Sequence, residues 1–108
     1  MKKFDENYQL LADMYQDGYF PNFLVDKVKE LVQSVISYLE TGEQDLEKIQ
    51  KHFDEMTLAI NDLQEEFEEN DSEIETAARD SIGETVEYIL KWFQIDLDVE
   101  DAIQERDW

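Results

Sequence analysis

The chain has 108 residues, of which 42% are hydrophobic, and its formal net charge at pH 7 is −20. This length suits one domain, residues 1–108. A surface with this much negative charge repels nucleic acids and anionic membranes, and we therefore expect no direct binding to either. The absence of cysteine excludes disulfides, a thiolate nucleophile and a zinc–thiolate site.

The first predicted helix ends at Asp17 and Gly18. Its apolar face is spaced by three and four residues and comprises Phe4, Tyr8, Leu11, Ala12 and Tyr15. A second helix is predicted to begin at Pro21, because the missing N–H of proline needs no partner at a helix start. It runs to about Glu40, with Gly42 as its stop, and its wide apolar stripe predicts the most buried helix of the fold.

The third predicted helix has the most regular apolar pattern, formed by Leu46, Ile49, Phe53, Met56, Ile60, Leu63 and Phe67. A fourth helix is predicted to start at Ser72, which forms the capping-box pattern S-x-x-E with Glu75, and to reach Phe93. A short last helix is predicted after Asp98, which would cap it. No segment alternates as a strand does and the connections are short. The sequence therefore predicts an all-α fold, a compact antiparallel bundle of four helices plus a short C-terminal helix.

An acidic stretch, NDLQEEFEENDSEIETAARD, covers residues 61–80 and carries eight carboxylates before Arg79, its only basic residue. At 100° per residue, the acids of the third and fourth helices lie opposite the apolar stripes of those helices. One interpretation is therefore that the acids form the solvated outer faces of two amphipathic helices.

A second interpretation is a protein-binding surface. Residues 53–78 contain ten acids and no basic residue, and like charges at i,i+4 destabilise a helix by a few tenths of a kcal/mol per pair. A surface that keeps such repulsion favours a basic protein partner, as in immunity proteins, antitoxins and DNA mimics, or self-association. On this hypothesis the chain is not an enzyme and has no cofactor, and the partner contacts Glu65, Glu66 and Glu69.

An aromatic turn, MYQDGYFPNFLVDK, covers residues 14–27 and contains Tyr15, Tyr19, Phe20 and Phe23. These side chains would staple the first helix to the second. Any of them that remain exposed would form a second part of the partner site, because tyrosine and phenylalanine are frequent interface anchors. A further apolar surplus, in Trp92, Phe93 and Trp108, would suit a structural subunit of an assembly.

An enzymatic alternative rests on a resemblance to the all-α nucleoside triphosphate pyrophosphohydrolases. The run EEFEE, residues 65–69, resembles the E-E-x-x-E half of their motif, and ETVE, residues 84–87, resembles the E-x-x-D half, with glutamate where aspartate is expected. The resemblance implies Mg²⁺ that binds phosphates and activates water. Its ligands would be Glu65, Glu66, Glu69, Glu84 and Glu87. Because these acids are predicted to face outwards, a second subunit would have to close the site.

The aromatic turn, the acidic stretch and the closing RDW together resemble a family of small uncharacterised acidic bacterial proteins, known as a domain of unknown function. The resemblance covers nearly the whole chain, implies a bacterial cytosolic origin and transfers no catalytic residue. Asp5, Glu6 and Asn7 interrupt the apolar run that a signal peptide needs, and no apolar run approaches the roughly 18 residues of a membrane helix. We therefore expect a cytoplasmic protein.

Overall fold

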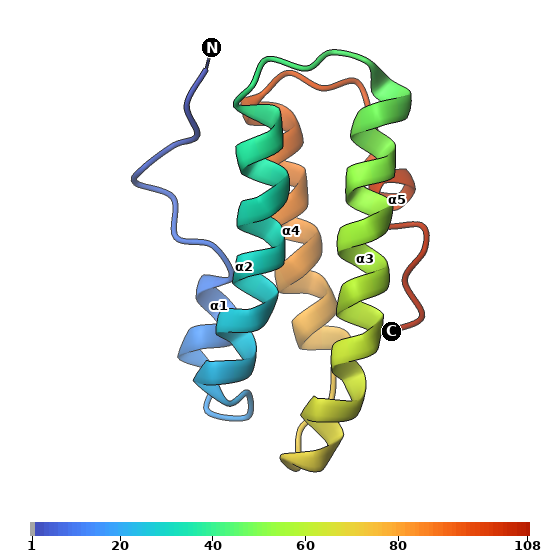
Figure 1. Ribbon diagram of the computed structural model, residues 1–108. Coiled ribbons are helices and arrows are strands. Elements are labelled where there is room, and N and C mark those ends of the chain that lie inside the picture. The colour runs from blue at the N-terminus through green and yellow to red at the C-terminus, as the bar shows by residue number, and fades with distance from the viewer. Residues whose placement is uncertain (1) are drawn as a thin grey trace.

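The computed structural model describes residues 2–108, and within that range the chain is helical without strands. Figure 1 shows three long and two short helices: α1 (Ala12–Gln16), α2 (Asn22–Leu39), α3 (Leu46–Glu69), α4 (Thr76–Trp92) and α5 (Val99–Ala102). The radius of gyration is 13.4 Å, close to the value of about 13 Å expected for a compact domain of this length. The predicted all-α bundle with a short C-terminal helix is confirmed.

The three long helices share one hydrophobic core. α2 and α3 lie side by side and run antiparallel, with α4 behind them (Figure 1). The predicted apolar stripes of the three helices face inwards, except that Leu46, the first residue of α3, is 42% exposed. α4 buries as many residues as α2, so α2 is not the single most buried helix. Besides its apolar residues, α4 buries the small side chains of Ala78, Ser81 and Thr85.

The predicted first helix is mostly wrong, because residues 4–11 are not helical and α1 has only five residues. The main cause is a local turn at Asp5. Its carboxylate accepts a hydrogen bond from the Asn7 N–H (2.9 Å), and its carbonyl accepts one from the Tyr8 N–H (3.3 Å). Such side-chain bonds to nearby backbone compete with helix formation. Leu11 then takes a left-handed conformation (φ 57°), and its N–H donates to the Thr85 hydroxyl at 3.3 Å.

The N-terminal segment, residues 2–11, ties α4 to the end of α2. Its hydrogen bonds include those from the Trp92 indole N–H to the Lys3 carbonyl (2.8 Å), from the Tyr88 hydroxyl to the Asp5 carboxylate (2.6 Å), and from the Phe4 N–H to the Glu40 carboxylate (2.8 Å). Tyr88 was not identified from the sequence as part of any cluster. The segment is therefore not helical, and several of its polar groups form hydrogen bonds with α4 and with the end of α2 instead.

Aromatic packing completes this attachment. The ring centroid of Phe4 lies 6.0 Å from those of Tyr88, Trp92 and Phe93, and Tyr8 stacks on Tyr88 at 3.9 Å. Two of the three side chains that suggested an assembly subunit therefore pack within their own chain. The third, Trp108, packs against the core, although its buried indole N–H has no hydrogen-bond partner.

The predicted capping box at Ser72 is also wrong. The Ser72 N–H donates to the Phe67 carbonyl (2.8 Å), and the Asp71 N–H donates to the Glu68 carbonyl (3.1 Å). With Asp71 left-handed at φ 59°, these bonds form the Schellman motif that ends α3. Ser72 is therefore used by the preceding helix, its hydroxyl is buried without a hydrogen-bond partner, and α4 begins only at Thr76.

The C-terminal segment lies along α3. The Asn61 amide donates to the Glu105 carbonyl (2.8 Å), and its oxygen accepts from the Asp107 N–H (3.1 Å). Asp98 precedes α5 as predicted, but its carboxylate makes no capping hydrogen bond. Within residues 2–108, none of the helices is both long and apolar enough to cross a membrane.

We expect Asp71→Gly to raise the free energy of unfolding by roughly 0.5–1 kcal/mol, because glycine adopts the left-handed region without a Cβ clash. The change also removes a carboxylate from the C-terminal end of α3, where the helix dipole disfavours negative charge. Urea unfolding at neutral pH would measure the effect.

Gln94→Gly is the matched control, because Gln94 ends α4 with the same left-handed backbone (φ 56°) and carries no charge. If the free energy of unfolding rises in both variants, the effect comes from backbone conformation. If it rises in Asp71→Gly alone, the effect comes from charge. A loss of stability in both would contradict the expectation.

Candidate functional site

The acidic stretch occupies the end of α3, the following turn and the start of α4. Glu65 and Glu69 are exposed on α3, and Glu66 is half-buried and forms an ion pair with Lys27 of α2 at 2.6 Å. Within residues 2–108, this is the single ion pair made by any acid of the stretch. The rest of its carboxylates therefore meet solvent without a neutralising partner.

The aromatic turn divides into a structural half and an exposed half. Phe20 is 3% exposed and packs its ring 6.4 Å from that of Phe67. Tyr15 is half-buried, and its hydroxyl donates to the Asp26 carboxylate at 2.5 Å. Tyr19 and Phe23, in contrast, are 42% and 52% exposed. Phe20 thus packs against α3, and the link from α1 to α2 is the hydrogen bond of Tyr15 to Asp26. Tyr19 and Phe23 remain exposed.

The structure brings the exposed aromatics and the acidic stretch together at one end of the bundle. The turn before α2 and the turn after α3 both lie at the lower end in Figure 1. Phe23 lies one helical turn before Lys27 on α2, and Asn70 lies one turn after Glu66 on α3. Because the two helices are antiparallel and Lys27 pairs with Glu66, Phe23 lies about level with Asn70. We call this surface the aromatic–acidic corner. It consists of Tyr19, Phe23, Glu66, Glu73 and Glu75.

The surroundings of Tyr15 and Tyr19 raise the pKa values of both side chains. Partial burial, and then the carboxylates of Glu75 and Glu73, raise the pKa of Tyr19 above its usual value. Burial and the hydrogen bond to Asp26 raise the pKa of Tyr15. Tyr19 thus stays a neutral hydrogen-bonding phenol in a negative environment.

The acids of the enzymatic alternative are not brought together. Glu65, Glu66 and Glu69 lie on α3, whereas Glu84 and Glu87 line a groove of about 290 Å³ between α4 and α5. That groove also contains two arginines, whose positive charge disfavours a metal cation. Within residues 2–108, no group of three or more histidine, aspartate or glutamate side chains could hold a metal ion.

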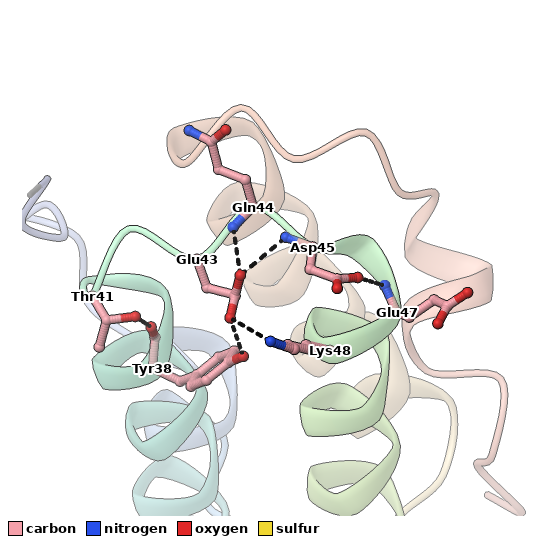
Figure 2. A network of polar contacts seen from close by, with 7 residues as sticks. All are labelled: Tyr38, Thr41, Glu43, Gln44, Asp45, Glu47 and Lys48. Carbon is pink, nitrogen blue, oxygen red and sulfur yellow. Dashed lines mark hydrogen bonds and ion pairs between the residues drawn. The ribbon is translucent and has the colours of Figure 1, made fainter.

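Figure 2 shows a polar network centred on Glu43, in the loop between α2 and α3. One oxygen of the Glu43 carboxylate accepts from the Tyr38 hydroxyl (3.0 Å), and the other accepts from the N–H groups of Gln44 (3.1 Å) and Asp45 (3.2 Å). The Lys48 ammonium lies 3.9 Å from the first oxygen. The backbone bond from Asp45, followed by the Tyr38 bond, lowers the pKa of Glu43.

This network orders the start of α3. The Asp45 carboxylate caps the helix by accepting from the Glu47 N–H (3.0 Å), and the Tyr38 ring stacks on His52 at 3.6 Å. Neither Asp45 nor Glu43 was identified from the sequence, although an aspartate directly before an apolar helix is an N-cap signal. A cavity of about 370 Å³ adjoins the loop, but the Glu43 carboxylate on its wall already has its hydrogen bonds within the loop. We therefore assign the network a structural role.

The profile of a protein family matches residues 4–108, nearly the whole chain. The chain belongs to this family. It is described as a family of unknown function (DUF5713), which confirms the resemblance to an uncharacterised domain. No curated protein and no solved structure matches the chain significantly.

We expect Glu43→Gln to lower the free energy of unfolding at pH 7 and to lose this effect in acid. Because the folded-state pKa of Glu43 lies below its ordinary value of 4.5, its contribution is complete above that pH and disappears as the pH falls through the folded-state pKa. Urea unfolding from pH 7 down to about pH 3 would follow the difference between wild type and variant.

Glu55→Gln serves as the control, since Glu55 is exposed on α3 and forms no ion pair within residues 2–108. It measures the background effect of removing one negative charge from an acidic protein. The structural role of Glu43 is rejected if the two variants show the same stability at every pH.

Proposed function

We propose that this protein is a non-enzymatic binding module that contacts a basic protein partner through its acidic surface, in the class of immunity proteins, antitoxins or DNA mimics. The observation that supports this most is the aromatic–acidic corner, where unpaired carboxylates border exposed Tyr19 and Phe23. We extend the proposal to a bacterial, cytoplasmic protein.

Electrostatics favours a basic partner. Carboxylates at i,i+4 on a helix, such as Glu65 and Glu69, are about 6 Å apart along the axis, within the screening length of about 8 Å at physiological ionic strength. Their repulsion is therefore only partly screened in the free protein. Basic side chains of a partner would relieve it on binding, whereas a second copy of this chain would add an equally acidic surface.

The arrangement of the acids also favours a binding role over the Mg²⁺-dependent pyrophosphohydrolase. A shared metal needs carboxylates from several elements to converge on one point. Here Glu65 and Glu69 face solvent from α3, and Glu84 and Glu87 face the groove beside α5. A broad surface of separate carboxylates suits a protein partner better than a single cation.

We expect the triple reversal Glu65→Lys, Glu66→Lys and Glu69→Lys to raise the Kd for the partner by about tenfold or more, since it turns attraction into repulsion. Folding should persist, because surface ion pairs such as Lys27–Glu66 contribute about 0–1 kcal/mol. Affinity purification from the organism that encodes the protein, at low and high salt, would supply the partner. Calorimetry with the purified pair would then give the Kd.

The matched control is the triple reversal of Glu6, Glu30 and Glu84, exposed acids that make no ion pair within the described part of the chain. It changes the net charge by the same amount away from the acidic end of α3. If both triple variants bind the partner as wild type does, the acidic surface is not the binding site.

A further inference from the structure

We propose that Tyr19 and Phe23 anchor the partner by binding an arginine next to an apolar side chain, with the guanidinium held between the Tyr19 ring and the carboxylates of Glu73 and Glu75. This inference rests on the proposed function, because it specifies which segment of a basic partner is recognised and where.

The two aromatic side chains are exposed, and both come from ordered backbone. The Tyr19 N–H donates to the Asp17 carboxylate at 3.0 Å, and the Tyr19 ring packs edge-on at 5.1 Å from buried Phe20. Phe23 lies in the first turn of α2, two residues after Pro21. Anchors that are already ordered lose less conformational entropy on binding, which favours affinity.

The unpaired carboxylates of the aromatic–acidic corner favour binding of a cation supplied by the partner. Lys27, the basic residue nearest along α2, already pairs with Glu66. Glu73 and Glu75, between α3 and α4, have no ion pair within residues 2–108, and their charges raise the pKa of the Tyr19 hydroxyl. Arginine suits this arrangement better than lysine, because its planar guanidinium binds carboxylates with two hydrogen bonds and stacks on aromatic rings.

The protein covers other aromatic rings with its own lysines. Lys29 lies 5.9 Å from the ring centroid of Tyr15, and Lys2 lies 5.0 Å from that of Trp92. Within the described residues, no cation lies over Tyr19, although the carboxylates of Glu75 and Glu73 make its surroundings negative. A cation–π contact from the partner would complete the same pattern.

Phe23 provides the apolar part of the anchor. It lies one helical turn before Lys27, on the side of α2 that faces the end of α3. An apolar side chain beside the partner's arginine could therefore cover Phe23 while the arginine contacts Tyr19. Interfaces commonly place their binding energy in such aromatic anchors surrounded by polar groups.

The test uses three short peptides as probes: GRRLRRG, GKKLKKG and GEELEEG. We expect GRRLRRG to bind more tightly than GKKLKKG and GEELEEG not to bind, as followed in ¹⁵N-labelled protein by NMR. The amide signals that shift should be those of residues 17–24 and 70–76. The double variant Tyr19→Ala and Phe23→Ala should raise the Kd for GRRLRRG by about fivefold.

Two further variants separate the anchor from general effects. Tyr19→Phe keeps the ring and should retain the affinity. Leu58→Ala removes another large apolar side chain, 49% exposed on the acidic face of α3, and should leave the Kd unchanged. Unaltered amide signals away from the corner show that each variant is folded.

The outcomes distinguish this inference from the proposed function. GRRLRRG could bind but shift the amide signals along α3, with its affinity unchanged in the double variant. The proposed anchor would then be wrong, and the acidic surface would still bind basic partners. If neither basic peptide binds better than GEELEEG, both proposals are overturned. A preference for lysine over arginine would overturn the stacked guanidinium.

Discussion

The packing of α2 against α3 is the contact on which the rest of the structure depends. Two antiparallel apolar stripes meet along the length of both helices, and α4 closes the core from behind. This pairing fixes Phe20 against Phe67 and Lys27 against Glu66. The turn before α2 is thereby placed beside the turn after α3, so two segments far apart in the sequence form one surface.

The strong negative charge is the opposing constraint. A net charge of −20 on 108 residues destabilises a compact state through self-repulsion. The structure limits this cost by giving carboxylates local roles, as in the Glu43 network and the Asp45 cap, and by turning the others outwards. The unpaired acids at the end of α3 have no such role. Their position next to exposed aromatic side chains is the observation on which the proposed binding function rests.

The N-terminal segment shows how the bundle is completed without a fourth long helix. Phe4 and Tyr8 cover the C-terminal half of α4 with aromatic contacts, and backbone groups of Lys3 and Phe4 pair with side chains of α4 and α2. Rings that would otherwise be exposed, on Trp92 and Phe93, thus become part of the protein's own packing. The available apolar surface is correspondingly reduced, which directs attention to Tyr19 and Phe23.

The sequence by itself determined the helical class, the three long helices and the outward orientation of the acids, because a period of three to four residues follows directly from helix geometry. It did not determine the conformation of residues 4–11 or the role of Ser72. At these places a local turn at Asp5 and the Schellman motif that ends α3 form hydrogen bonds with backbone groups that the predicted helices would have used. Only the tertiary structure decided that Phe20 is buried while Tyr19 and Phe23 are not. These side chains are close in sequence and alike in chemistry, and their difference arises from which of them faces Phe67 across the interface between α2 and α3.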